Sequence, residues 1–535
     1  MKKYLLIIIL IIAAALRLWQ IGAVPPSPDW DEAALGYNAY SVLKTGRDEF
    51  GVFLPRVLRS FDDFKPPLYM YLTIPSVAVF GLEVWAVRLP SAIVGILAVL
   101  GAYLLVRQLF KKDQLALLAA FLLAISPWHI QFSRIAFEAN VALGITIWAV
   151  YAFLRGTGST KWLGISALLF GLGFYAYHSQ RVFLPLLVLT LFLHWKKELL
   201  ADKKRMAVGI IVGLLTILPL VPVFLSKDSY TRLSGTSVLA DKTGLLMRSV
   251  AKLQEDAATG NKLGMIFDNR RVVYVQKLAE GYLSHFSLKW IFLTGDNSRH
   301  HAPEMGLMYL MELPLLLWGL FLVWKKGDRA GRLMLTWFLL APVAASPTSE
   351  TPHAIRTLVF LPTLQVFVAT AILAAWERMR GKRALWWKAA GALWAIAFAA
   401  NIAFYFHMYF VHMNIEYSRF WQYGYKQAVE YALAHKDEYE KIVVSTKLEQ
   451  PHMFFLFYTK YDPATYLAEG GTASGGFEEW RNRFDKFEFR PIGPWDQELR
   501  DGTVLYIGTP QEIVTGASNS VFYLNGEEAI RIGDQ

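Results

Sequence analysis

The stretch KYLLIIILIIAAALRLWQIGAVPPSPDWDE, residues 3–32, joins an almost purely apolar run to a cluster of acids. Residues 4–18 carry a single charge, at Arg17, and can enter a lipid bilayer as a helix. Asp29, Asp31 and Glu32 follow shortly afterwards. The stretch therefore predicts a membrane helix that is followed closely by three carboxylates. The first predicted helix and the first candidate catalytic residues thus lie in the same segment.

The composition is that of a membrane protein. Of 535 residues, 55% are hydrophobic and only 18% are charged, whereas a soluble chain of this length would carry more charge. Aromatic residues make up 15%, as expected where Trp and Tyr mark membrane interfaces. The chain has no cysteine, which excludes disulfides, thiol nucleophiles and thiolate metal sites.

Repeated apolar segments predict a polytopic α-helical membrane protein with about 11 transmembrane helices. The first could be a signal peptide, but its apolar core is long and no small-residue cleavage site is evident, which favours a retained helix. The predicted spans are residues 4–18, 85–106, 114–126, 139–154, 162–178, 182–194, 206–225, 306–323, 331–345, 354–376 and 386–410.

The net charge of +11 could suggest a nucleic-acid partner, but the positions of the basic residues argue against one. They collect in alternate loops, all on the side of Lys2 and Lys3, as the positive-inside rule requires. The N-terminus is therefore expected in the cytoplasm, with no nucleic acid bound. The basic loops are residues 107–112, 155–161, 194–205, 324–332 and 377–388.

The opposite face is expected to carry the long segments, namely residues 20–84, 226–305 and the tail from 413. Residues 65–81 are apolar and broken by proline, which predicts an interfacial or re-entrant helix. In the tail, helix and strand patterns alternate, so residues 1–412 are predicted as a transmembrane domain and residues 413–535 as a small extracytoplasmic α/β domain. The expected elements of the tail are a helix at 420–434 and strands at 441–446, 486–492, 503–508 and 520–524. The glycine-rich residues 470–476 lack the spacing of a nucleotide-binding loop.

Polar residues gather on the predicted outer side, and ionisable groups near membrane helices mark function by default. Arginine and lysine suit phosphate, and a carboxylate among them suits general base catalysis, so the expected substrate is a lipid phosphate. The candidate donor phosphate-binding residues are Lys65, Arg88, Arg134, Arg181 and Arg356. Further candidates for substrate binding are Tyr37, Tyr69, Tyr177, His178, Arg299, His300, His301 and His353.

Several candidates have a simpler structural explanation. Asp29 is predicted as the N-cap of a helix that ends near Gly46, which puts Glu32 at the capping-box position. Asp31 fills neither position, although it could favour the helix dipole. Lys65 could snorkel from an interfacial helix, and the outer arginines could anchor the interface or pair with Glu138. The sequence RHH at 299–301 could bind metal or phosphate, or be an ordinary polar loop.

The order DE at 31–32, KPPLY at 65–69 and RLPSA at 88–92 resembles the GT-C membrane glycosyltransferases. The nearest branch is the protein O-mannosyltransferase and aminoarabinose-transferase (ArnT-like) group, and the resemblance is best over about residues 1–200. It implies transfer of a monosaccharide from a polyprenyl-phosphate carrier, with inversion, on the non-cytoplasmic side of a bacterial-type cytoplasmic (inner) membrane. Acceptors in such a reaction could be a glycan, a lipid or a protein.

The resemblance also implies roles for single residues. Asp31 matches the catalytic aspartate, Lys65 the lysine near the donor phosphate, and Glu138 a second acid; Glu32 is kept as a further catalytic candidate. Some relatives have a metal-binding carboxylate directly before KPP, where this chain has Phe64. Asp62 or Asp63 could substitute, so no cofactor is required by the sequence and a divalent metal stays open.

Two rival hypotheses belong to other classes. A transporter or flippase for a lipid-linked sugar would share the cationic outer surface. However, the sequence shows no two-half internal repeat, and its polar residues collect at one face rather than near the midplane. The second rival is a lectin-like or assembly subunit without catalysis, built around the predicted α/β tail.

Overall fold

The computed structural model describes residues 2–61, 63–226, 237–238, 244–380, 384–474, 481–498 and 502–534. The chain divides into two compact units, each assembled from separate stretches. The helical unit consists of residues 1–13, 97–129 and 142–402, and the mixed unit of residues 14–96, 130–141 and 403–535.

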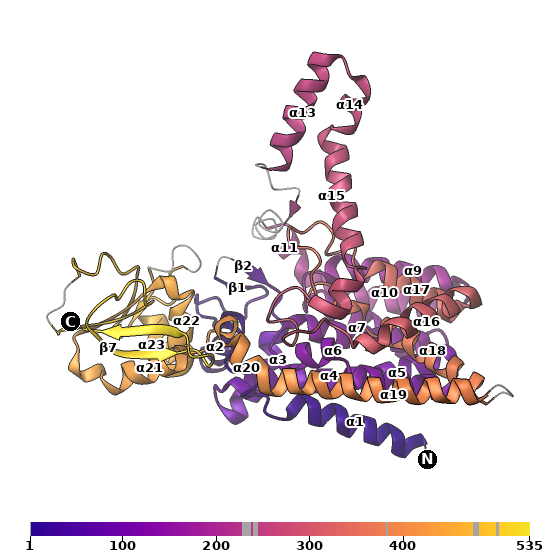
Figure 1. Cartoon of the computed structure of the whole chain (residues 1–535), viewed down its shortest axis with the longest axis horizontal. Coiled ribbons are helices and arrows are strands. Elements are labelled where there is room, and N and C mark those ends of the chain that lie inside the picture. The colour runs from indigo at the N-terminus through magenta and orange to yellow at the C-terminus, as the bar shows by residue number, and fades with distance from the viewer. Residues whose placement is uncertain are drawn as a thin grey trace. The chain divides into compact units, whose positions relative to one another are not determined.

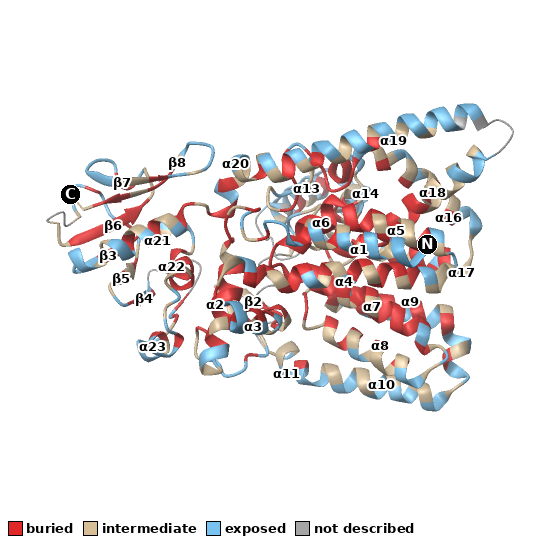
Figure 2. Ribbon diagram, turned by 90° about the horizontal axis from the view of Figure 1, so that it is seen from below, coloured by how far each residue is buried: buried red, intermediate tan, exposed pale blue. Residues whose placement is uncertain are grey.

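The helical unit is a bundle built on pairs of neighbouring helices (Figure 2). The closest pairs are α8 with α10 and α16 with α18. At Gly319 of α16 even a Cβ atom would collide with the backbone of Phe367 in α18, so only glycine allows this approach. The bounds are α4 Val84–Phe110, α5 Asp113–Ile125, α7 Glu138–Gly156, α8 Thr160–Gly173, α9 Gln180–Leu200, α10 Lys203–Ile217, α16 Leu313–Lys326, α17 Arg329–Leu340, α18 Thr363–Met379 and α19 Ala384–His407.

Every apolar segment predicted as a span contains a helix, beginning with α1 at Lys2–Leu18. Among the described residues, five helices are long and apolar enough to cross a membrane by themselves. They are Val84–Phe110, Glu138–Gly156, Lys203–Phe224, Leu358–Met379 and Lys388–Trp421. A sixth forms if α5 and α6 (Pro127–Arg134), which are bent by 57°, count as one span. The chain is therefore a membrane protein, while about eleven crossings remain a prediction.

Helices fill much of the long segment predicted at residues 226–305. α13 (Leu245–Thr259), α14 (Lys262–Phe267) and α15 (Arg270–Ser284) contact one another and form an arm (Figure 1). Asn269 caps α15, because its side chain accepts a hydrogen bond from the backbone N–H of Arg271. Residues 227–236 and 239–243 of this segment lie outside the described residues.

In the mixed unit, α2 (Trp30–Thr45) begins and ends where the sequence predicted. Asp29 is the N-cap, both hydrogen bonds of the capping box with Glu32 are present, and Gly46 ends the helix in the left-handed conformation at φ 72°. A hairpin of β1 (Leu58–Ser60) and β2 (Asp63–Lys65) precedes α3 (Leu68–Phe80). α3 confirms the helix expected at 65–81, whereas its place at the membrane interface stays a prediction.

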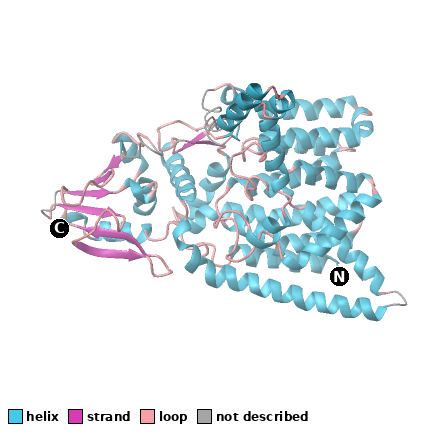
Figure 3. Ribbon diagram, turned by 45° about the horizontal axis from the view of Figure 1, so that its top comes forward, coloured by secondary structure: helices cyan, strands magenta, loops and turns pink. Residues whose placement is uncertain are grey.

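The strands of the tail, magenta near the C-terminus in Figure 3, lie side by side. They form one six-stranded sheet in the order β4-β5-β3-β6-β8-β7. β3 runs parallel to β5 and β6, and the other pairs are antiparallel. The predicted strands are confirmed as β3, β5, β6 and β7, and the predicted helix as α21, whereas β4 and β8 were not anticipated. The bounds are α21 Tyr425–Ala434, β3 Lys441–Val444, α22 Pro451–Thr459, α23 Pro463–Ala468, β4 Arg483–Phe484, β5 Phe487–Phe489, β6 Val504–Gly508, β7 Ala517–Phe522 and β8 Glu528–Gly533.

The tail packs against the first long segment, residues 20–84. α2 packs against α22 and α23, and the buried Glu49 accepts a hydrogen bond of 2.6 Å from Thr472. The Tyr37 hydroxyl donates to the carbonyl of Tyr461 at 3.3 Å. The compact units therefore differ from the predicted boundary at 412/413, because apolar and polar contacts tie residues far apart in the sequence.

Candidate functional site

The adjacent acids Asp31 and Glu32, in the first turn of α2, form ion pairs with two different cations. Glu32 is buried and points to Arg88 of α4. Its Oε1 accepts from Arg88 Nε at 2.8 Å and from the backbone N–H of Ala136 at 2.7 Å. Its Oε2 accepts from Arg88 Nη2 at 2.8 Å and from the Asp29 N–H at 3.3 Å. The carboxylate thus joins three parts of the chain.

The guanidinium of Arg88 also makes all its hydrogen bonds within the protein. Besides the two bonds to Glu32, its Nη1 donates to the carbonyls of Ile21 and Pro25 at 3.0 and 2.9 Å, and its Nη2 donates to Ser27 at 2.7 Å. A guanidinium has five N–H groups, and all five are used here. The geometry therefore gives Glu32 and Arg88 a structural task, and the roles predicted for them in catalysis and in phosphate binding stay predictions.

Arg134 also serves the fold. It is fully buried at the end of α6, where Nη1 donates to Leu16 at 2.8 Å and Nη2 donates to Val24 at 2.9 Å. Its guanidinium lies over the rings of Tyr409 and Phe410, 5.6 and 5.2 Å from their centroids. These contacts join the end of α1 to two distant segments, and phosphate binding by Arg134 stays a prediction.

Asp31 forms an ion pair with Lys65, the last residue of β2. The Lys65 side chain is only 9% exposed, whereas 33% of the Asp31 side chain is open to solvent. Burial lowers the pKa of Lys65, but attraction to Asp31 and Glu138 outweighs it, so the pKa stays above its usual value. Lys65 therefore stays positively charged beside the carboxylates of Asp31 and Glu138. Of these two, Asp31 is partly exposed to solvent.

The remaining candidates of the mixed unit pack rather than face a site. Tyr69 is fully buried and its hydroxyl donates to the carbonyl of Val87 at 2.9 Å. Tyr37 is buried and meets the ring of Tyr466 edge-on. Asp63 lies at the start of β2, and Asp62 lies outside the described residues. The structure thus brings Asp31, Lys65 and Glu138 together.

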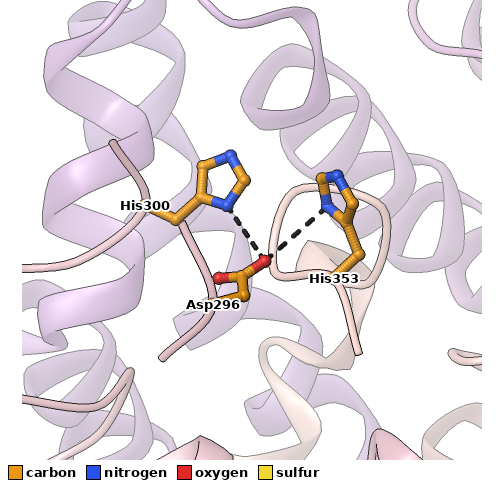
Figure 4. Close-up of side chains that lie close together, drawn as sticks. All are labelled: Asp296, His300 and His353. Atoms are coloured by element: carbon orange, nitrogen blue, oxygen red, sulfur yellow. Dashed lines mark hydrogen bonds and ion pairs between the residues drawn. The ribbon is translucent and has the colours of Figure 1, made fainter. Parts of the chain in front are cut away.

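In the helical unit, His300 and His353 converge on Asp296, a residue that the sequence analysis missed (Figure 4). His300 Nδ1 lies 3.0 Å and His353 Nδ1 3.9 Å from Asp296 Oδ2. Burial raises the pKa of Asp296, but His300 and the N–H of Ala354 outweigh it and hold that pKa well below its usual range. Burial, helped by His300 and Arg356, lowers the pKa of His353 to about 2. The spacing Asp-x-x-x-His at 296–300 is the signal that could have revealed the cluster.

The other candidates of the helical unit are spread over separate elements. Arg356 donates to the Thr348 hydroxyl at 2.7 Å, and Arg181 at the start of α9 lies over the ring of Phe224, 5.1 Å away. His301 Nδ1 lies 2.8 Å from the carbonyl of Ala302, and burial lowers the pKa of His301, an effect that the nearby Asp296 opposes. Tyr177 and His178 precede α9, and Arg299 lies beside His300.

Comparisons with known proteins agree with the resemblance seen in the sequence. Residues 64–222 match a family model described as dolichyl-phosphate-mannose-protein mannosyltransferase, a stretch that contains Lys65 and Glu138 but not Asp31. A curated Bacillus subtilis (strain 168) protein, "Putative mannosyltransferase YkcB", is 31% identical over 116 residues. That match covers 21% of this chain and only 16% of the curated relative.

Solved structures show the same fold over nearly the whole chain. ArnT from Cupriavidus metallidurans superposes with a TM-score of 0.54 in the apo state and 0.53 when bound to undecaprenyl phosphate. Identity is 13% and 14%, and each match covers 99% of this chain and 97% of ArnT. The archaeal oligosaccharyltransferase AglB from Archaeoglobus fulgidus, in complex with an inhibitory peptide and a dolichol-phosphate, gives 0.52 at 12% identity, over 96% of this chain and 70% of AglB. The chain therefore has the fold of the GT-C membrane glycosyltransferases and carries, at residues 64–222, a match to their mannosyltransferase family.

Proposed function

We propose that the chain is a glycosyltransferase that moves a monosaccharide from a polyprenyl-phosphate donor to a hydroxyl acceptor at the outer face of the cytoplasmic membrane. The observation that carries the proposal is the Asp31–Lys65 pair, which is partly open while its neighbour Glu32–Arg88 is sealed. The family match and the fold support it, as do solved relatives that bind undecaprenyl phosphate or a dolichol-phosphate.

Lys65 supplies the positive charge for the donor. Its ammonium has three N–H groups, so it can keep one carboxylate partner and still donate to a phosphate oxygen. Glu138 adds to the negative field that keeps Lys65 protonated. As the sugar–phosphate bond breaks, charge grows on the leaving oxygen, and a fixed cation in a buried position stabilises that charge.

Asp31 supplies the base. The acceptor hydroxyl attacks the anomeric carbon while Asp31 takes its proton, and the phosphate leaves with the electron pair of the broken bond. One new glycosidic bond replaces one glycosyl phosphate bond, with inversion at the anomeric carbon. The ion pair with Lys65 favours the ionised form of Asp31, which a base requires.

The frame around this pair explains why it can hold its geometry. Arg88 fixes α2 to α4 through Glu32, and the Asp29 cap fixes the first turn of α2. Asp31 lies between these two anchored residues, so its backbone is held on both sides. Positioning of a catalytic group within a fraction of an ångström is what such a supporting shell provides.

A test that separates this function from a flippase measures a covalent product. The purified full chain is mixed with polyprenyl phosphate carrying radiolabelled mannose, or in a parallel arm aminoarabinose, together with envelope lipids, glycans or proteins as acceptors. Release of free polyprenyl phosphate with label on an acceptor supports the proposal. Movement of intact donor across vesicles without any release, in every arm, would contradict it and favour the transporter.

A further inference from the structure

The cluster of Asp296, His300 and His353 lies outside the chemistry proposed above. Its three side chains come from two loops, residues 295–301 and 346–357, and point toward one another (Figure 4). The side chains are 13%, 7% and 13% exposed, respectively. Side chains of this kind, when largely removed from solvent, are stabilised if they share a proton or a cation.

The distances suit a shared ion better than a closed hydrogen-bond network. His300 Nδ1 and His353 Nδ1 lie 3.0 and 3.9 Å from the same oxygen of Asp296, and one potential ligand atom from each residue falls within 4.8 Å of the others. A tetrahedral zinc site with bonds of 2.0–2.2 Å places neighbouring ligand atoms roughly 3.3 Å apart. The observed pairs bracket this value, so small side-chain rotations would complete the coordination.

One nitrogen of the cluster lacks the hydrogen bond that a buried polar atom needs. His353 Nδ1 is buried and has no hydrogen-bond partner among the residues that the structure describes. Its separation from Asp296 Oδ2, 3.9 Å, is too long for a hydrogen bond. An unpaired buried nitrogen costs free energy, which a metal–nitrogen bond at this atom would remove.

Neighbouring groups orient the cluster as outer-shell partners orient metal ligands. The backbone N–H of Ala354 donates to Asp296 Oδ2 at 2.8 Å, which aims that carboxylate. The backbone N–H of His353 donates to His285 Nε2 at 3.1 Å, while His285 Nδ1 lies 2.6 Å from the carbonyl of Gly281. His285 is thereby committed to holding the His353 loop on α15. Such partners typically account for a 10- to 100-fold difference in metal affinity.

We propose that Asp296, His300 and His353 bind a divalent transition-metal ion of the zinc class. Two imidazoles and one carboxylate are preferred by zinc and its neighbours, whereas Mg²⁺ and Ca²⁺ prefer oxygen ligands throughout. Three protein ligands leave one position for water or an anionic oxygen. The ion also joins His300 to His353, which are 53 residues apart in the sequence, and such a cross-link reduces the conformational entropy of the unfolded chain. The site does not use Asp31 or Lys65, so it stands or falls independently of the proposed function.

The test measures metal on the full-length protein in detergent. The chain is incubated with excess zinc chloride, passed through a gel-filtration column, and analysed by elemental mass spectrometry. We expect about one zinc ion per chain, and a loss of most of it in Asp296→Asn and His353→Gln. His435→Gln is the matched control, because His435 lies beside Tyr431 in the mixed unit and should not affect the metal content. A wild-type chain without bound zinc, or full zinc retention in both cluster variants, would overturn the proposal.

A second measurement avoids the objection that these variants simply misfold. Since the chain has no cysteine, a single thiol can be introduced as a reporter. In His353→Cys loaded with Co²⁺, ligation predicts a near-ultraviolet thiolate-to-cobalt charge-transfer band, which His435→Cys should lack. Bands of equal strength in both variants, or in neither, would place the metal elsewhere and contradict the assignment.

Discussion

Asp31 and Glu32 are neighbours in sequence, each paired with one cation, yet they differ in how deeply the fold buries their side chains. Glu32 accepts four hydrogen bonds and Arg88 donates five, all within buried surroundings. Asp31 and Lys65 form an ion pair that stays one-third open on the Asp31 side. A fully buried ion pair, such as Glu32–Arg88, supports the fold. A pair that solvent still reaches, such as Asp31–Lys65, can bind a substrate group in addition. If this difference separates catalysis from structural support, substitutions in the two pairs will affect activity and stability unequally.

The largest effect is expected for Asp31→Asn. Removal of a general base costs about 10²–10⁴ in rate, while an amide of the same shape leaves the packing of α2 unchanged. Initial rates of sugar transfer and the thermal unfolding midpoint would be measured together. Glu83→Gln, which alters an exposed pair with Lys460 in the same unit, should keep wild-type rates. Transfer by Asp31→Asn within threefold of wild type would end the assignment of Asp31 as base.

Arg88→Met should instead reduce stability. It strands the buried Glu32 carboxylate, and breaking a buried pair from one side typically costs 3–5 kcal/mol. The free energy of unfolding in detergent would be compared with that of Arg47→Met, an exposed arginine that should change it by less than about 0.5 kcal/mol. Equal free energies of unfolding for Arg88→Met and Arg47→Met would contradict a structural role for the buried Glu32–Arg88 pair.

Lys65→Met should weaken turnover by about 10²–10³ through loss of the charge that faces the leaving phosphate. Lys65→Arg keeps the charge and should recover part of the rate, and Lys460→Met provides a control for loss of an exposed lysine in the same unit. Steady-state kinetics at varied donor concentration would show the loss mainly in kcat. Equal losses in the Met and Arg variants would mean that shape at residue 65, rather than its charge, is what matters.

The smallest effect concerns pH. The pKa of Lys65 is raised in the folded state, so its stabilising contribution is complete below the unfolded pKa of about 10.4 and is lost only as pH rises through the higher folded value. The difference in unfolding midpoint between wild type and Lys65→Met should therefore stay constant from pH 6 to pH 9. A difference that shrinks steadily across this range would show that Lys65 loses its charge earlier.

Local patterns in the sequence were enough to predict the parts that depend on near neighbours. The capping box of Asp29 and Glu32 is an i, i+3 relation, and the helix end at Gly46 follows from its left-handed conformation. The apolar periodicity likewise located the helices, and alternation located four strands of the tail. These features arise within a few residues, where propensity and capping act directly.

Non-local partners could not be predicted in the same way. Arg88 meets Glu32 across 56 residues and Arg134 meets Leu16 across 118, so their phosphate roles looked as plausible as structural ones. Asp296 escaped notice because its partner His353 follows only after 57 further residues. The sequence alone could not show that the tail packs against α2 instead of folding separately. Each of these contacts joins residues that are far apart in the sequence and forms only when the chain folds.

The mixed unit joins residues 14–96 to residues 403–535, so it can be completed only after the long stretch between them has been synthesised. Tyr409 donates to Gln131 at 2.7 Å and covers Arg134, and Asn414 donates to the carbonyl of Ala23 at 2.8 Å. Until these residues emerge from the ribosome, Gln131, Arg134 and Ala23 lack these contacts. The order of synthesis therefore delays completion of the unit that contains Asp31 and Lys65.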